Sequence, residues 1–417
     1  MNYFKTLSCI LSSSVFFFVI YLFPNTIKSN TVEPETRSMP SKNLSRLSFY
    51  FFRTKFNPVR EEMRHLENLQ PEEIVFRLFD VDIDNKGKKA TVISPLQIDN
   101  QAAKFLNKLE KTKISGLVFI TNRSIMKTAP DDISALAVNI LKKVDIILNN
   151  HRIEIRELQI DCDWNTSTRE KYFMLLEQIQ TVLKKRNIPL SATIRLHQIK
   201  FREKTGIPPV AKGILMFYNM DDPGKWETKN SVLDINIAKQ YTERLGEYPL
   251  PLDLALPLYS QTVIFSDGHI TGLIAGNITD QLKDTDCYEN ISPGRFRAKK
   301  MCLLRNNHGT KKEISAGSLL RFENTGSDEL LASLNLVLSQ RNHIRKIYIY
   351  DYHQALYTQN KTNVLDHLKN KQPLAKQDAN ALEKKSQLFL NKQNLEILYQ
   401  LSEIYRTYCS DPGFSCK

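Results

Sequence analysis

Short apolar runs alternate with amphipathic stretches along most of the chain. The runs have the length and the β-branched and aromatic content of buried strands, and the stretches between them repeat apolar residues at helical spacing. Alternating strands and helices predict a parallel sheet with helices packed outside it. The predicted strands span 47–53, 74–82, 116–122, 158–163, 190–196, 213–219, 252–259 and 346–351. The predicted helices span 59–69, 100–111, 131–149, 168–186, 232–245 and 328–342.

The number and order of these elements predict an α/β fold of one class. Eight strands with helices between them are typical of a (β/α)8 TIM barrel, here over residues 47–360. An open doubly wound sheet is the alternative. It is disfavoured because no glycine-rich phosphate-binding turn follows the first strand.

Three segments depart from a plain barrel. A stretch rich in turn residues after Asp82 is too short for a helical crossover and predicts a hairpin. A β-rich insertion at about 260–325, before the last strand, is expected to wall the barrel mouth. Its predicted strands span 262–265, 269–274 and 319–323. Residues 361–417 form a C-terminal extension with the pattern of a helical hairpin.

The N-terminus carries a targeting segment. A single lysine, Lys5, precedes an apolar run from Leu7 to Pro24, so residues 1–30 are expected to be a signal peptide or a short membrane anchor. The lack of a small-residue cleavage site favours the anchor. Residues 31–46 are polar and predict a linker. The protein is therefore expected to be exported, and to be periplasmic, on the cell surface or anchored to the membrane.

The cysteines agree with an oxidising compartment. Cys287 and Cys302 fall in one loop-rich region, and Cys409 and Cys416 bracket a C-terminal turn, which predicts two short-range disulfides. Metal binding is the rival interpretation, but C-x-x-C and histidines at ligand spacing are missing from the sequence. Cys162 is the odd cysteine and is expected to be a buried free thiol.

Composition excludes few function classes. The 417 residues are 41% hydrophobic and 25% charged, which is ordinary for a globular protein and excludes disordered, collagen-like and coiled-coil chains. The net charge of +13 suits an anionic partner, but acidic residues are interspersed throughout. Because no Lys/Arg block stands beside repeated aromatic residues, nucleic acid is not expected as a partner.

The strongest chemical candidates end the fourth predicted strand. In Ile160-Asp161-Cys162-Asp163-Trp164-Asn165, alternate side chains share a face. Asp161, Asp163 and, if the extended backbone continues, Asn165 are therefore expected to point into the barrel mouth. Two carboxylates this close raise one pKa, as glycoside chemistry requires. The structural alternative is that these aspartates bond neighbouring strands and support the barrel.

These residues resemble the fourth-strand signature D-x-x-D-x-D-x-E of chitinase-type glycoside hydrolases. Met216-Phe217-Tyr218-Asn219 resembles that family's M-x-Y-D, and Leu256-Pro257-Leu258-Tyr259 resembles its G-x-P-x-Y. The resemblance covers about residues 47–355. The runs FDVD at Phe79–Asp82 and QIDCD at Gln159–Asp163 also resemble exported bacterial barrel proteins related to glycoside hydrolases.

The resemblance implies that Asp161 and Asp163 orient and stabilise a reacting N-acetyl group. Asn165 stands where the family has its general-acid Glu, and an amide cannot donate that proton. Leu158 and Asn219 stand where the family has aspartates. The usual chitinase route is therefore not expected. Asp80, Asp82, Asp163 and Asp351 are the candidates for a relocated acid.

A glycan is the expected partner, because aromatic faces stack on sugar rings. Trp164 is either such a platform or core, whereas Trp226, in a polar loop, is the better candidate for a platform. Arg195 and the Tyr350–Asp351 strand end are also expected at the mouth. The predicted substrate-binding residues are Trp164, Asn165, Tyr218, Asn219, Trp226, Tyr259 and Asp351.

The sequence is compatible with two main functions and with a third possibility. The first is an exported or anchored barrel that hydrolyses an envelope or extracellular glycan, and the second is an inactive barrel that binds a glycan or protein through the same mouth. The third is an envelope scaffold that uses the C-terminal helices. No cofactor or metal is expected, and motifs for acyl, nucleotide or zinc-protease chemistry are missing from the sequence.

Overall fold

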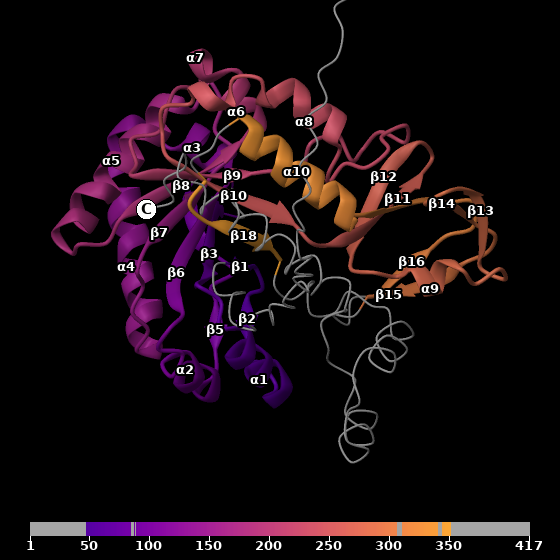
Figure 1. Cartoon of the computed structure of the whole chain (residues 1–417), viewed down its shortest axis with the longest axis horizontal. Helices are drawn as coiled ribbons and strands as arrows, with labels where there is room; N and C mark the ends of the chain where they lie inside the picture. The colour runs from indigo at the N-terminus through magenta and orange to yellow at the C-terminus, as the bar shows by residue number, and fades with distance from the viewer. Residues whose placement is uncertain (1–46, 85–86, 88, 307–310, 341–343, 352–417) are drawn as a thin grey trace, which may run out of the picture. The chain divides into compact units, whose positions relative to one another are not determined.

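Eight parallel strands close into a ring in the computed structural model, which describes residues 47–84, 87, 89–306, 311–340 and 344–351 (Figure 1). The last strand pairs with the first in parallel, with Leu47 opposite Ile347, and this pairing completes the ring. The predicted (β/α)8 barrel is confirmed. The ring strands, in spatial order, are β1 (Leu47–Phe51), β3 (Glu73–Ile83), β6 (Lys113–Ile120), β7 (Leu158–Asp161), β8 (Leu190–Arg195), β9 (Lys212–Met216), β10 (Leu252–Pro257) and β18 (Ile347–Tyr350).

Helices cover the outside of the ring, as the sequence pattern predicts. The buried positions of α4 recur three and four residues apart, which gives this helix one apolar face toward the strands. Its buried residues are Ile133, Leu136, Ala137, Ile140, Leu141, Val144 and Ile147. The α-helices are α1 (Arg60–Leu69), α2 (Asn100–Leu106), α3 (Asn122–Lys127), α4 (Ile133–His151), α5 (Arg169–Lys185), α6 (Leu196–Lys200), α7 (Arg202–Thr205), α8 (Ile235–Thr242), α9 (Thr279–Leu282) and α10 (Ser327–Gln340).

Additional strands lie outside the ring. The predicted hairpin after Asp82 is formed by β3 and β4, and β2 pairs with β5. Between β10 and β18, five strands form a second sheet in the order β12-β11-β17-β14-β13, and β15 pairs with β16. The additional strands are β2 (Lys55–Phe56), β4 (Ala90–Ile93), β5 (Gln97–Ile98), β11 (Ser260–Ser266), β12 (His269–Ala275), β13 (Tyr288–Ser292), β14 (Arg295–Ala298), β15 (Cys302–Arg305), β16 (Lys311–Ile314) and β17 (Leu319–Asn324).

The inserted strands have a small core of their own, which includes Ile274, Phe296 and Leu320. A disulfide joins Cys287 to Cys302 beside this core, with a Cα–Cα distance of 6.0 Å, as predicted. Cys162 is buried and free, also as predicted. The second predicted pair, Cys409 and Cys416, lies outside the described residues.

The predicted targeting segment, the linker at 31–46 and the C-terminal helical hairpin also lie outside the described residues. Within the part of the chain that the structure describes, no helix has both the length and the apolar character needed to cross a bilayer.

A buried ionic cluster fills the end of the barrel where the strands begin. Lys212 on β9 donates to Asp253 on β10 at 2.6 Å and lies 3.0 Å from Glu157, which precedes β7. On the other side of the ring, Glu73 on β3 accepts from Lys346 at 2.6 Å. Tyr348 joins the two groups, because its hydroxyl donates to Glu73 and accepts from Lys212. Buried charges need such partners, so this end of the barrel is held by electrostatics rather than by apolar packing alone.

Candidate active site at the barrel mouth

Asp161 is the last residue of β7, and its side chain points into the mouth of the barrel, where the strands end. The residue is 3% exposed and accepts a 2.6 Å hydrogen bond from Oγ1 of Thr193 on β8. Burial raises the pKa of the Asp161 carboxyl above its usual value of 3.8. Asp163 and Asp80 raise this pKa further, whereas Arg195 and Thr193 lower it. The predicted raised pKa therefore falls on Asp161, with burial as its main cause.

Arg195, the last residue of β8, connects the two aspartates. Its Nε donates to Oδ1 of Asp163 at 2.5 Å, and its Nη2 lies 3.7 Å from Oδ1 of Asp161. The guanidinium also lies over the ring of Tyr218, 5.9 Å from the centroid. Its Nη1 is buried and has no hydrogen-bond partner among the described residues. One cation therefore serves both carboxylates, and Arg195 is a mouth residue as predicted.

Asn165 lies beyond the strand on which its predicted position depended. Strand β7 ends at Asp161, so strand alternation does not place Asn165 at the mouth. Asn165 is exposed. Its Oδ1 accepts two hydrogen bonds from Ser167, one from the backbone N–H at 2.9 Å and one from the side-chain hydroxyl at 2.7 Å. This turn leads directly into α5, so the side chain at the general-acid position shapes a helix start.

Three tyrosines cluster beside Arg195. The rings of Tyr218 and Tyr350 stack with centroids 5.0 Å apart, and Tyr259 lies 5.5 Å from Tyr350 at a steep angle. The hydroxyl of Tyr259 donates to Oδ1 of Asn219 at 2.8 Å. Asn219 is exposed and has a left-handed backbone with φ of 57°. The predicted residues Tyr218, Asn219 and Tyr259 therefore belong to one cluster, the tyrosine cluster below.

Asp80 and Asp82, the first candidates for a relocated acid, are each paired with an arginine. Arg77 contacts both carboxylate oxygens of Asp80, and Arg123 contacts both oxygens of Asp82. The hydrogen bonds from Arg123 are the largest cause that lowers the pKa of Asp82. These pairs hold the two carboxylates as acceptors. With its lowered pKa, Asp82 does not have the environment of a proton-donating acid.

Asp351, the remaining candidate, follows β18 directly. It is 9% exposed, and a cis peptide bond joins it to Tyr350. Its neighbour Tyr350 stacks in the tyrosine cluster, so the end of β18 lies at the mouth as predicted.

The two tryptophans have different environments. Trp164 is fully buried, stacks on Tyr172 and donates from Nε1 to the carbonyl of Thr205 at 2.9 Å. It is a core residue, so the prediction of a sugar platform is wrong for Trp164. Trp226 is half-buried, with the edge of Phe265 against it and the guanidinium of Arg295 4.6 Å from its centroid.

Several residues at the mouth were not predicted from the sequence. Thr193 stands two residues before Arg195 on the same strand face, which is a signal that the alternation offers. Arg77 stands three residues before Asp80, and a regular strand would place the two on opposite faces. A register shift between Arg77 and Phe79 brings them together, and nothing in the sequence marks this bulge.

No protein-family model matches the chain, and no curated protein matches it either. Solved structures with a similar fold include the spore cortex-lytic enzyme SleL of Bacillus megaterium QM B1551, with 12% identity and a TM-score of 0.45 over 74% of this chain and 70% of that one. A chitinase of Chromobacterium violaceum has 10% identity and a TM-score of 0.44, over 74% and 94% of the chains. A GH18 chitinase of Cycas revoluta in complex with (GlcNAc)4 has 11% identity and a TM-score of 0.45, over 74% and 95%.

These similarities concern the fold alone. Within the described part of the chain, no group of three His, Cys, Asp or Glu side chains is placed to hold a metal ion.

Proposed function

We propose that this protein binds a glycan of N-acetylated amino sugars at the mouth of a glycoside-hydrolase-like barrel and does not cleave it. The observation that carries the proposal is the position of Arg195 between Asp161 and Asp163. Asp163 is engaged by this arginine as a hydrogen-bond acceptor, and Asp161 is buried behind it at 3% exposure. Asn165, in the place of the family's acid, is part of a turn. Loss of a general acid costs about 10²–10⁴-fold in rate, which leaves recognition as the better supported role.

The mouth has the groups that a sugar ligand requires. The side chain of Asp163 is 51% exposed, so one carboxylate held by Arg195 remains accessible to hydroxyl and amide donors. Tyr350, which is partly exposed and stacks on the buried Tyr218, supplies an aromatic side chain beside it, and exposed Asn219 supplies an amide. Tyrosine is suited to this role because it combines apolar area with a polar tip. By resemblance, Asp161 and Asp163 are the two aspartates that orient and stabilise the N-acetyl group.

Hydrolysis is the second candidate, and one observation favours it. Asp161 is buried and has a raised pKa, while Asp163 is half-exposed, so two neighbouring acids occupy different environments. Such a difference is how one carboxyl holds a proton while another stays ionised. For hydrolysis, Asp163 would have to leave Arg195, receive the proton held by Asp161 and donate it to the leaving oxygen.

The experiment that tests the proposal measures binding and turnover together. The purified protein is titrated with chito-oligosaccharides and peptidoglycan fragments in a calorimeter, and the same mixtures are analysed for products by mass spectrometry. We expect binding without products, and weaker binding for Asp163→Asn. The matched control is Asp145→Asn, because Asp145 forms a surface pair with Arg186 on the outer helices. Products that disappear in Asp163→Asn alone would establish the hydrolase, and the absence of binding would reject both candidates.

We also propose that the protein is exported. The Cys287–Cys302 disulfide supports this, because disulfides persist in oxidising compartments, and so does the apolar run from Leu7 to Pro24. Alkylation of free thiols in intact cells, followed by mass spectrometry, tests the compartment. We expect Cys287 and Cys302 to resist alkylation until a reductant is added. Alkylation of both without a reductant would place the protein in a reducing compartment.

A further inference from the structure

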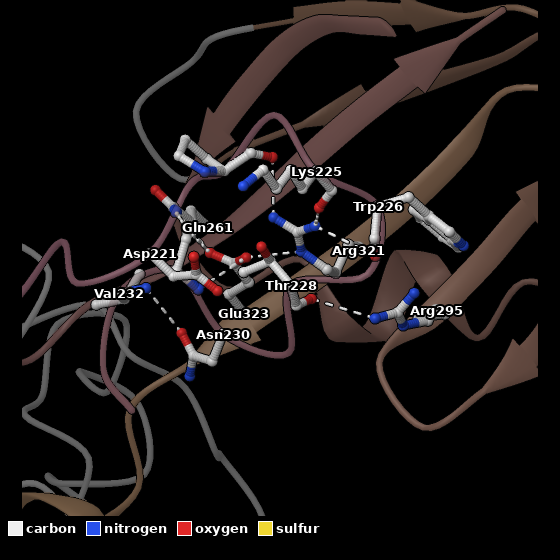
Figure 2. A network of polar contacts seen from close by, with 12 residues as sticks. Asp221, Lys225, Trp226, Thr228, Asn230, Val232, Gln261, Arg295, Arg321 and Glu323 are labelled. Atoms are coloured by element: carbon white, nitrogen blue, oxygen red, sulfur yellow. Dashed lines mark hydrogen bonds and ion pairs between the residues drawn. The ribbon is translucent and has the colours of Figure 1, made fainter. Parts of the chain in front are cut away.

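A buried ion pair on the inserted sheet holds the long loop that follows β9. Arg321 and Glu323 on β17 are 1% and 2% exposed, and Nε of Arg321 donates to Oε1 of Glu323 at 2.7 Å. Arg321 also donates to the carbonyls of Pro223 and Lys225 in this loop, as Figure 2 shows. The loop, residues 217–234, is called the β9–α8 loop below. Its middle is therefore fixed to a strand 98 residues later in the sequence.

Glu323 is the centre of this network (Figure 2). Its Oε1 accepts from the backbone N–H of Ser231 at 3.1 Å, in addition to Arg321. Its Oε2 accepts from the hydroxyl of Ser231 at 2.6 Å and from Nε2 of Gln261 at 2.7 Å. Both oxygens thus accept two hydrogen bonds each, from donors on β17, β11 and the β9–α8 loop. A carboxylate can do this, whereas an amide has only one oxygen.

Ser231 continues the connection to the mouth. Its carbonyl accepts from the N–H of Met220 at 2.8 Å, and the carbonyl of the next residue, Val232, accepts from the N–H of Asn219 at 2.8 Å. These two bonds set the backbone of Asn219, whose Oδ1 accepts from the hydroxyl of Tyr259. The path from Glu323 to the tyrosine cluster therefore consists of hydrogen bonds at each step.

A second contact from the same strand reaches the other side of Tyr259. Thr325, directly after β17, donates from Oγ1 to the carbonyl of Tyr259 at 3.3 Å and to that of Pro257 at 3.4 Å. Tyr259 is thus held at its hydroxyl by the β9–α8 loop and at its backbone from β17.

From these contacts we propose that Glu323 is a positioning residue for the mouth, acting through Ser231 and Asn219 on Tyr259 and its neighbour Tyr350. The inserted sheet then sets the arrangement of the aromatic faces. A buried ion pair is weak evidence for stability, because apolar residues of similar volume often stabilise as well. The four hydrogen bonds that the Glu323 carboxylate accepts instead hold β17, β11 and the β9–α8 loop in one arrangement. The consequence for ligand binding rests on the proposed glycan-binding function.

The test combines a glycan-independent measurement with a binding measurement. The full protein is labelled with ¹³C-tyrosine, and the ring resonances are assigned with single Tyr→Phe variants. We expect Glu323→Gln to shift the resonances of Tyr259 and Tyr350 and to weaken chito-oligosaccharide binding about tenfold, the equivalent of one lost hydrogen bond. Ser231→Ala removes only the hydroxyl, so it is a milder variant that reports the same effect if Glu323→Gln does not fold.

The matched control is Glu289→Gln, the same chemical change on the same sheet. Glu289 pairs with Arg297 at 3.2 Å, and both side chains are about half-exposed. We expect this variant to leave the tyrosine resonances and the affinity unchanged. Unshifted rings in folded Glu323→Gln and Ser231→Ala would overturn the positioning role, even if the wild type binds glycans. If the wild type binds no glycan, the proposed function fails and the ring shifts alone decide the role of Glu323.

Discussion

Arg195 donates a 2.5 Å hydrogen bond from Nε to Oδ1 of Asp163, so a fixed cation and a half-exposed carboxylate form one unit at the barrel mouth. The same guanidinium is the nearest positive charge to buried Asp161. The charge balance of Asp161 and Asp163 therefore depends on a single residue from β8.

Substitution of Arg195 by methionine should destabilise the protein. It leaves buried Asp161 without its cation, and removal of one partner from a buried pair costs about 3 kcal/mol. Arg186→Met is the control, because the Arg186–Asp145 pair lies on the surface and is worth at most about 1 kcal/mol. Guanidinium denaturation at pH 7 measures both. Equal losses for the two variants would contradict the assigned role of Arg195.

Asp161→Asn should change how stability depends on pH. The pKa of Asp161 is raised in the fold, mainly by burial, so the folded state binds the proton more tightly than the unfolded state does. The wild type therefore loses stability as pH rises from about 3.8 through the folded pKa of Asp161. Asparagine does not titrate, so the variant does not lose stability in this way. We therefore expect the free energy of unfolding of the variant, relative to that of the wild type, to increase with pH over this range.

Asp82→Asn should change the pH dependence of stability in the opposite direction. The pKa of Asp82 is lowered, first by the hydrogen bonds from Arg123, so its ionised form stabilises the fold. That contribution is complete above about pH 3.8 and is lost as pH falls. Urea denaturation between pH 3 and 7 measures both differences. Parallel curves for the two variants would show that the environment of Asp161 is not as described.

Removal of the disulfide should weaken the inserted strands. Cys287 and Cys302 are separated by 15 residues, and closing a loop of that length is worth about 3 kcal/mol in the chain-entropy model. We expect the double variant Cys287→Ser/Cys302→Ser to unfold at a lower temperature than the wild type. A reductant should lower the wild-type Tm to that of the variant and leave the variant unchanged. An unchanged wild-type Tm would mean that the disulfide adds nothing measurable.

Lys212→Met should be costly at the other end of the barrel. Lys212 lies between the buried carboxylates of Glu157 and Asp253, and the variant would leave both without this cation, at about 3–5 kcal/mol. The control is Lys113→Met, because Lys113 is about half-exposed and lies 3.6 Å from Glu72. Thermal unfolding with calorimetry compares them, and a Tm equal to that of the control would contradict the role of this ion cluster.

The barrel itself was predictable because its strands are buried on both faces. Runs such as Leu252–Pro257 are apolar except for Asp253, and every residue of this run is buried, which is typical of parallel strands covered by helices. These runs alternate with helical patterns. All eight strands were placed to within a few residues. Strands β13 to β16 were missed because they are four or five residues long and partly exposed, which leaves little hydrophobic pattern to detect.

The site was predictable in part, and the limits have physical causes. Asp161 stood out because an acid in an apolar strand requires a partner. The prediction for Asn165 depended on where β7 ends, and the alternation pattern alone does not mark that end, which lies at Asp161. The ion cluster around Lys212 was missed because its members are far apart in the sequence and look like ordinary interspersed charges.

The pairing of β1 with β18 has a consequence for the order of events during synthesis. The edge of β1 that receives Ile347 stays unpaired until some 300 residues have followed it. Contacts of such sequence separation form slowly, and an open strand edge can pair with other chains in the meantime. During most of its synthesis the polypeptide therefore has only an incomplete sheet. The last strand of the ring, β18, both closes the ring and adds Tyr350 to the mouth.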